Sequence, residues 1–348
     1  MSRHSWTAIV SAVSFTVLVA LVALVPVPYV SWAPGRTVDL LGAGQSGQPA
    51  VTVNGIATHP VTGELRMTTV SVTRVDSTLT LPGALWAWLR PNHDALPRSV
   101  VYPPDKSVAQ VKREEVAQMD TAQSAAIVAA LREAKVPVTA MPVVDTVSIT
   151  GPAYGKLQPS DLIERIDQTV VSSPDQVRTL ISKHAVGDQV VFSVRRQNKL
   201  LDVTVTTVAA NQDKAVPVVG IKTAKGYLYT PSVTYGISSD VVGPSAGLVF
   251  SLAIYDKVTP GDLMAGRHVA GTGTINADGV VGSIGGIQEK IAGAQEQGAT
   301  VFLVPAANCV DLAGVQTTMN LLKVATLNDA VTSLTKLKDN PSATVPHC

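Results

Sequence analysis

The most apolar stretch of the chain lies near its N-terminus. No Asp, Glu, Lys or Arg occurs between Arg3 and Arg36, and residues 8–25 are almost wholly apolar. An apolar helix of this length can span the hydrocarbon core of a bilayer. The stretch "VPVPYVSWAPG" that follows has no clear small-residue cleavage site, so the pattern predicts an uncleaved signal anchor in residues 1–34. A cleaved signal peptide is the alternative interpretation.

The orientation of this span follows from the charge that flanks it. Arg3 precedes the apolar run, and basic residues favour the cytoplasmic side of a membrane. We therefore expect a single-pass protein with its N-terminus in the cytoplasm and the remaining chain outside. Tyr29 and Trp32 are expected at the outer membrane interface.

Residues 35–119 show only short periodic segments. "GAGQSGQPAVTVNG" predicts a flexible link, and the alternation over residues 65–75 predicts a strand. "GALWAWLRP" predicts a short helix, whose Trp86 and Trp88 are expected to pack against a neighbouring domain, with contact to lipid headgroups as the alternative. The whole segment is interpreted as a linker with strand and helix elements that pack near the domain that follows.

A second unit is predicted over residues 120–210. Its first element is an Ala-rich helix over residues 120–135, which an Asp-Thr pair can cap. A turn, a strand over residues 161–166 and a helix that opens at Ser173 with Pro174 in its first turn come next. A hairpin over residues 189–208 closes the unit.

The composition narrows the classes of function. The 348 residues include 27 basic and 26 acidic side chains, so no basic surface predicts a nucleic-acid partner. The stretch "GPAYGKL" has neither the spacing nor the Ser or Thr of a P-loop, so no ATP site is predicted. Cys309 and Cys348 are too few for a zinc site, and they form either one disulfide bridge or two free thiols. We predict no metal and no cofactor.

"DVVGPSAGLVF" places Ser245 inside a G-x-S-x-G pattern. Pro244 suits the first turn of a helix, and the residues that follow predict a helix buried nearly all round. Ser245 would then lie near unpaired backbone N–H groups that favour an oxyanion. The alternative is an α/β-hydrolase elbow, which needs a histidine downstream. Only His268 and His347 follow, and neither is well placed, so a Ser-His-Asp triad is disfavoured.

A lysine offers another base. Residues 287–297 predict a helix that Gly298 ends, followed by a buried strand over residues 300–304. Lys290 lies at the edge of the apolar stripe, where burial lowers a lysine pKa and makes the amine a general base. A side chain that extends to water is the alternative. The stripe consists of Ile287, Ile291 and Ala294, while Gln288, Glu289, Gln295 and Glu296 are expected to face solvent.

The middle of the chain resembles the PDZ domain of bacterial proteases. "GPAYG" matches the G-S-P-A turn of that family and "LQPSDLI" its L-x-P-G-D-x-I motif, with Ser160 in place of a glycine. The resemblance covers residues 136–210. The stretch "VPVTAMPVVDTV" lacks a glycine-rich loop for a peptide carboxylate, so peptide binding and simple positioning of neighbouring domains both stay open.

Residues 215–335 resemble the protease domain of Lon, which uses a Ser-Lys dyad, and the predicted domain with its C-terminal tail covers residues 215–348. "GPSAG" matches the family's D-G-P-S-A-G with Val242 in place of the acid, and "GGIQEK" meets its G-G-[LIV]-x-E-K motif. The resemblance implies Ser245 as nucleophile, Lys290 as base and Thr272 as hydrogen-bond partner of the lysine. Thr274 replaces a family glutamate. The motifs also assign supporting positions to Gly243, Pro244, Ala246, Gly247, Gly285, Gly286 and Glu289.

The combined organisation is similar to bacterial membrane-anchored PDZ proteins with a Lon-like serine protease domain and no ATPase domain. This resemblance implies an α+β chain with an N-terminal transmembrane helix, a β-rich PDZ-like domain and an α/β proteolytic domain. It implies an ATP-independent endopeptidase of the bacterial cell membrane, with its catalytic domain outside the cytoplasm. Unfolded or flexible proteins would be its substrates, and a homohexameric ring its assembly. Because of Val242 and Thr274, an inactive adaptor is the alternative.

Overall fold

The computed structural model describes residues 3–44 and 47–348, and it divides into two compact units. The smaller unit is Val136–Thr230, and the larger combines Met1–Lys135 with Pro231–Cys348. Both units mix helices with sheets, so the predicted α+β class is confirmed.

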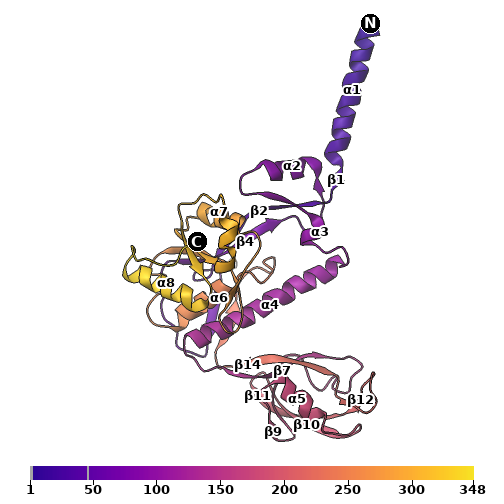
Figure 1. Cartoon of the computed structure of the whole chain (residues 1–348), viewed down its shortest axis with the longest axis vertical. Helices are drawn as coiled ribbons and strands as arrows, with labels where there is room; N and C mark the ends of the chain where they lie inside the picture. The colour runs from indigo at the N-terminus through magenta and orange to yellow at the C-terminus, as the bar shows by residue number, and fades with distance from the viewer. Residues whose placement is uncertain (1–2, 45–46) are drawn as a thin grey trace. The chain divides into compact units, whose positions relative to one another are not determined.

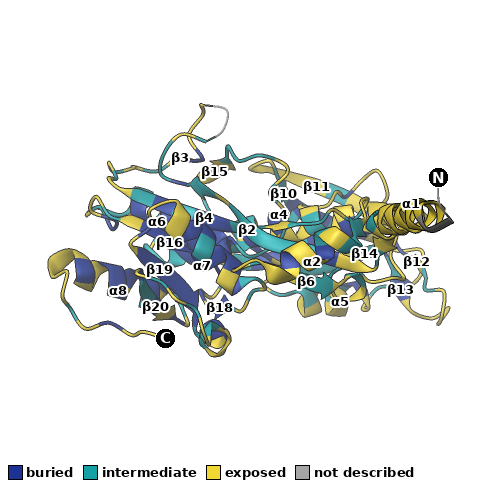
Figure 2. Ribbon diagram, turned by 90° about the horizontal axis from the view of Figure 1, so that it is seen from above, coloured by how far each residue is buried: buried dark blue, intermediate teal, exposed yellow. Residues whose placement is uncertain are grey.

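The larger unit begins with helix α1 (Arg3–Leu24). Within it, Ser5–Leu24 has a mean hydropathy of 2.4 and is not buried against protein, and Figure 2 colours α1 as exposed along its length. At 1.5 Å per residue such a helix is about 30 Å long, the thickness of a hydrocarbon core. It is therefore a candidate span, although a signal sequence has the same length and composition. Residues 1–2 of the predicted stub lie outside the described residues.

A six-stranded sheet forms the centre of the larger unit, in the order β20-β19-β16-β4-β2-β6 (Figure 2). The pairs from β20 to β4 are parallel, whereas β2 pairs antiparallel with both β4 and β6. Its strands are β2 (Tyr29–Asp39), β4 (Glu64–Val72), β6 (Asp94–Pro97), β16 (His268–Gly271), β19 (Val301–Pro305) and β20 (Asn320–Val324).

Helices and short strand pairs surround this sheet. The helices are α2 (Leu81–Leu89), α3 (Arg98–Val101), α4 (Val108–Glu133), α6 (Gly247–Val258), α7 (Ile287–Glu296), α8 (Leu327–Asp339) and the 3₁₀ helix η1 (Ala306–Leu312). The antiparallel pairs are β1 (Pro26–Val27) with β5 (Leu79–Thr80), β3 (Val51–Asn54) with β15 (Ser232–Tyr235), and β17 (Thr274–Ile275) with β18 (Val281–Gly282).

The observed division differs from the expected one at residues 35–119. This segment is neither a linker nor part of the smaller unit, because β4 pairs in parallel with β16 and completes the sheet of the larger unit. The expected flexible link also contains β3, whose Val51 and Val53 are buried. Partners some 200 residues apart leave no local pattern in the sequence, which is why the prediction placed this segment elsewhere.

Helix α4 also differs from its prediction. It begins at Val108 rather than Asp120, and Ser107 caps it by accepting a hydrogen bond from the Gln110 N–H while the Gln110 side chain accepts from the Ser107 N–H. The first half of α4 is mostly exposed, so it has no apolar stripe to reveal it. The helix belongs to the larger unit, not to the PDZ-like one.

The smaller unit is a sheet in the order β11-β10-β8-β7-β14, with β9 on β8 and helix α5 (Pro174–Ile181) packed on β7 and β14. Ser173 caps α5 by accepting a hydrogen bond from the Gln176 N–H, as predicted. The strands are β7 (Thr139–Val147), β8 (Leu162–Ile166), β9 (Thr169–Val170), β10 (Gln189–Arg196), β11 (Lys199–Thr206) and β14 (Ile221–Leu228), with the separate pair β12 (Val208–Ala209) and β13 (Pro217–Val218).

Candidate active site

The serine loop precedes α6. The helix begins at Gly247 with Ala246 as its N-cap, so Ser245 and Pro244 lie just before the helix rather than in its first turn. The chain reaches its helical geometry late because Gly243 adopts a φ of 93°, in the left-handed region. Among the described residues, the N–H groups of Ser245 and Ala246 donate to no protein acceptor. These two donors are therefore available to an incoming oxyanion.

Close packing explains the second glycine of the motif. A Cβ at Gly247 would lie 3.0 Å from the backbone nitrogen of Ile275 in β17, which leaves no room for a side chain. Helix α6 itself is buried over Leu248–Ile254, as its sequence predicts. Packing against β17 therefore requires a glycine at position 247, and Ser245 lies just before the first residue of this buried helix.

The carbonyl of Ser245 is held by the segment that follows β16. The Thr272 hydroxyl donates to it at 3.0 Å and the Gly273 N–H at 2.8 Å. In turn, the Leu248 N–H donates to the Gly273 carbonyl at 3.0 Å. The position of the serine loop is therefore fixed from both sides.

Lys290 is buried, with 3% of its surface exposed. Its Nζ donates a hydrogen bond to the Thr272 hydroxyl at 3.1 Å. Burial lowers the pKa of Lys290 to about 8, and neighbouring Glu289 opposes this shift only in part. The interpretation of Lys290 as a side chain that extends to water does not fit this geometry.

Thr272 links the serine loop to the lysine. Its hydroxyl proton goes to the Ser245 carbonyl, so its oxygen presents a lone pair to the Lys290 amine. In the described chain no hydrogen bond joins Ser245 Oγ directly to Lys290 Nζ. Thr272 thus joins the backbone of Ser245 to a buried amine, and a serine, a buried amine and available backbone donors are the groups that acyl transfer uses.

Glu289 differs from its prediction because it is buried, not solvent-facing. Its side chain lies towards Asp94 of β6, the strand at the far edge of the sheet. Burial and the nearby Asp94 carboxylate raise the pKa of Glu289, which favours its neutral form. A helical wheel could not show this contact, because β6 comes from a part of the chain almost 200 residues earlier.

The two glycines before α7 pack against Trp32. A Cβ at Gly285 would lie 2.9 Å from the Trp32 ring, and one at Gly286 would lie 3.1 Å from it and 2.6 Å from Val70. Gly286 also has a φ of 69°. Trp32 therefore packs inside the larger unit, and its expected place at the membrane interface is wrong. It is a supporting residue that sequence reasoning missed, because nothing local connects it to the lysine motif.

A cavity of about 370 Å³ opens beside the serine loop. Helix α4 forms one wall, and Thr274 and Pro244 lie on the other side. Two residues differ from the Lon motifs, and they lie in different surroundings. Thr274 lines this cavity, whereas Val242 is exposed. The lining residues are Glu114, Ala117, Gln118, Thr121, Ala122, Pro244, Thr274 and Ile275.

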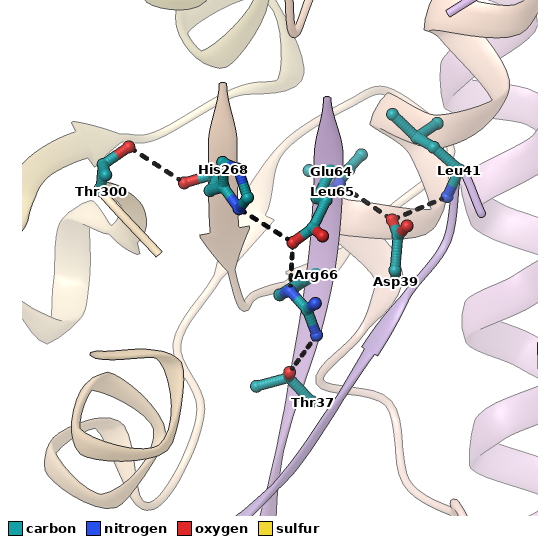
Figure 3. A network of polar contacts seen from close by, with 8 residues as sticks. All are labelled: Thr37, Asp39, Leu41, Glu64, Leu65, Arg66, His268 and Thr300. Atoms are coloured by element: carbon teal, nitrogen blue, oxygen red, sulfur yellow. Dashed lines mark hydrogen bonds and ion pairs between the residues drawn. The ribbon is translucent and has the colours of Figure 1, made fainter. Parts of the chain in front are cut away.

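The two histidines considered for a triad have other surroundings. His268 lies 3.1 Å from Glu64, in a network that also includes Arg66 and Thr37 (Figure 3). His347 lies in the C-terminal tail, paired with Leu322. Residues 236–246 contain no strand that leads into the serine, as an α/β-hydrolase elbow would require.

Cys309 of η1 and Cys348 form a disulfide bridge. The tail is also held by the Lys323 N–H, which donates to the Pro346 carbonyl at 2.9 Å. Across residues 3–44 and 47–348, no group of three or more His, Cys, Asp or Glu side chains is arranged to hold a metal ion.

The smaller unit has an edge strand beside a helix. β14 pairs only with β7 along its length, and α5 contacts both strands. The turn Val219-Gly220 precedes it, with a φ of 76° at Gly220. The stretch "VPVTAMPVVDTV", which lacks a glycine-rich loop, forms most of β7 and its approach, whereas the glycine turn that leads into the edge strand lies after β11. Only the strand order reveals this.

Comparison with known protein families identifies two domains. Residues 237–336 match the Lon protease (S16) C-terminal proteolytic domain, and residues 118–207 match the PDZ domain. The PDZ match begins inside α4, whereas the compact smaller unit begins at Val136. The chain therefore contains a Lon-type proteolytic domain and a PDZ domain, and the first of these supports serine-peptidase activity.

Individual relatives match the proteolytic domain. Lon protease of Roseiflexus castenholzii is 44% identical over 70 residues, which are 20% of this chain and 8% of that protein. Lon protease of Clostridium beijerinckii is 37% identical over 93 residues, 26% of this chain and 11% of that protein. The chain thus spans about a tenth of the length of these relatives. The PDZ domain of the SdrC-like protein from Listeria monocytogenes is 26% identical, covers 24% of this chain and 87% of that chain, and has a TM-score of 0.23.

Proposed function

We propose that this protein is a serine endopeptidase in which Ser245 is the nucleophile and Lys290 the general base. The observation that carries the proposal is the buried Lys290 amine, which Thr272 connects to the serine loop. An amine with a pKa near 8 is neutral in a useful fraction of molecules at neutral pH. The Lon-type match over residues 237–336 supports the same chemistry.

The reaction would be an acyl transfer. Neutral Lys290 accepts the Ser245 Oγ proton while the oxygen attacks a peptide carbonyl carbon, and the N–H groups of Ser245 and Ala246 stabilise the oxyanion. The Lys290 ammonium then donates its proton to the leaving amine. A water molecule, deprotonated by the Lys290 amine, then attacks the acyl-enzyme, and hydrolysis of the ester restores the free Ser245 hydroxyl.

We further propose that the enzyme is anchored in the bacterial cell membrane by α1, with its catalytic domain outside the cytoplasm. The apolar Ser5–Leu24 helix supports the anchor. The Cys309–Cys348 disulfide supports the location, because such bridges persist in oxidising compartments.

The substrates would be unfolded or flexible proteins, cleaved without ATP hydrolysis. The cavity beside Pro244 offers room for a substrate side chain next to the nucleophile. The exposed edge of β14 would add a strand from an extended peptide, the way PDZ domains bind. A homohexameric ring remains an expectation from the resemblance to Lon.

Cleavage of casein and of an unfolded peptide by the full chain in detergent tests the dyad. Ser245→Ala and Lys290→Ala are each expected to lower kcat/KM at least about a thousandfold, because each removes a reacting group. Lys257→Ala, in the helix α6 that follows Ser245, is the control for loss of a half-buried lysine outside the proposed dyad. Equal activity in all proteins would exclude the dyad.

The same assay separates the enzyme from the alternative adaptor. A folded wild-type chain that cleaves neither substrate would favour the adaptor, in which the valine at position 242 has left the serine loop inactive. Near-UV circular dichroism of each variant establishes that the fold is retained.

A further inference from the structure

Helix α2 presents an apolar face to solvent. The exposed fractions are 50% for Leu85, 62% for Trp86, 70% for Trp88 and 69% for Leu89. The opposite side of the helix carries the small, buried Ala84 and Ala87. Leu85 and Leu89 lie one turn apart, and the two indoles flank them on either side. A soluble surface seldom gathers such residues without a function in binding.

The position of α2 indicates what this face contacts. The candidate membrane span α1 ends at Leu24, and the N–H of Leu81, the first residue of α2, donates to the Val25 carbonyl at 3.3 Å. The pairing of β1 with β5 holds the two segments together, with Pro26 opposite Thr80. Figure 1 shows α2 beside the end of α1, and the two helices are in contact. The helix therefore starts where the chain would leave the bilayer.

The chemistry of this face fits a lipid surface. Indole rings combine an apolar body with a polar N–H, and they concentrate at the level of the lipid headgroups. The Arg90 guanidinium lies 4.9 Å from the centre of the Trp86 ring, where it is placed to reach lipid phosphates. Helix α2 contains no charged residue that would oppose entry into the interface.

We propose that α2 lies in the headgroup region of the membrane that α1 spans, with Leu85 and Leu89 towards the acyl chains. The inference rests on the membrane anchoring of the proposed function, but not on its catalytic part. Because α2 also packs on β2 and β6, it would fix the catalytic sheet against the membrane surface. One flexible span alone would leave that sheet free to rotate.

Brominated lipids provide the test, because bromine on an acyl chain quenches only indoles inside the bilayer. The full chain is reconstituted in vesicles of phosphatidylethanolamine and phosphatidylglycerol, with and without brominated acyl chains. Trp6→Phe leaves Trp32, Trp86 and Trp88, and the triple variant that also carries Trp86→Phe and Trp88→Phe leaves Trp32 as background. We expect brominated lipid to cause a loss of emission in the Trp6→Phe protein that the triple variant does not show.

Two results would overturn the proposal. Quenching of Trp86 and Trp88 by aqueous acrylamide but not by bromine would place them in water. Protection from both quenchers would mean that protein, such as a second copy, covers α2. The Trp86→Phe/Trp88→Phe protein keeps Trp6 and tests the anchor separately. If Trp6 escapes bromine, the anchoring fails, whereas quenched Trp6 with unquenched Trp86 and Trp88 refutes only the role of α2.

Discussion

The strand β16 (His268–Gly271) has polar side chains at both ends, and the two ends differ in their access to water. At its start, the exposed His268 lies beside Glu64, whose carboxylate accepts a hydrogen bond from Arg66 at 2.6 Å (Figure 3). Just after its end, buried Thr272 accepts a hydrogen bond from buried Lys290. The first site pairs opposite charges, and the second leaves a cation with a neutral partner.

This difference separates a structural ion pair from the proposed reactive site. The hydrogen bond from Arg66 lowers the pKa of Glu64 and keeps its carboxylate ionised. The ion pair therefore maintains the contact between the two side chains. Lys290 has no carboxylate hydrogen-bonded to its amine, and burial therefore disfavours its charge and lowers its pKa. Lys290 therefore has the lowered pKa that its proposed role as a general base needs.

Apart from the loss of Ser245 or Lys290 itself, a change of pH is expected to have the largest effect. With a Lys290 pKa of about 8, the neutral base becomes scarcer below that pH, and kcat/KM should fall about fifty-fold between pH 8 and pH 6. Initial rates of peptide cleavage over this range measure the effect. A flat profile with the protein folded throughout would contradict Lys290 as the base.

The same pKa shift also affects stability. The pKa of Lys290 is lower in the folded state than the usual 10.5. The contribution of neutral Lys290 to the unfolding free energy is therefore complete above pH 10.5, and it is lost as the pH falls through about 8. The loss amounts to roughly 3 kcal/mol of unfolding free energy. Lys290→Met should remove this dependence, and denaturant unfolding at several pH values separates it from the effect on rate.

Thr272→Val is expected to have the next largest effect. It removes the hydroxyl that positions both the lysine and the Ser245 carbonyl, so kcat should fall roughly ten- to hundredfold. Because the hydroxyl oxygen stabilises the ammonium form, its loss should also move the acid limb of the pH profile to lower pH. Thr300→Val is the matched control, because the Thr300 hydroxyl, just before β19, donates to the His268 carbonyl at the start of β16. An unchanged acid limb would show that Thr272 is only structural.

His268→Ala is expected to have the smallest effect. The network around His268 is partly exposed, so its loss should change the unfolding free energy by less than about 1 kcal/mol. Its kcat/KM for peptide cleavage should stay within about twofold of the wild type, since the described hydrogen bonds of its side chain go to Glu64 and not to the serine loop. A decrease comparable to that of Lys290→Ala would restore the histidine triad as the better hypothesis.

The aromatic residues show where sequence reasoning is reliable and where it fails. Its local assignments hold, since α2, α5 and α7 are found close to their predicted residues. The predicted surroundings of the tryptophan side chains differ from the observed ones. Trp32 packs on Gly285 and Gly286 instead of the membrane interface, and Trp86 and Trp88 are exposed instead of packed against a domain.

Local sequence patterns were enough to predict the candidate span, the serine and lysine motifs and the helices α6 and α7 that follow or contain them. These features depend on hydrophobic periodicity and on residues close together in the chain. Only the tertiary structure decided that β2 and β4 complete the catalytic sheet, that Glu289 is buried towards Asp94, and that α2 starts at the end of α1. Burial and long-range strand pairing depend on residues far apart in the chain, and the pKa of Lys290 depends on both.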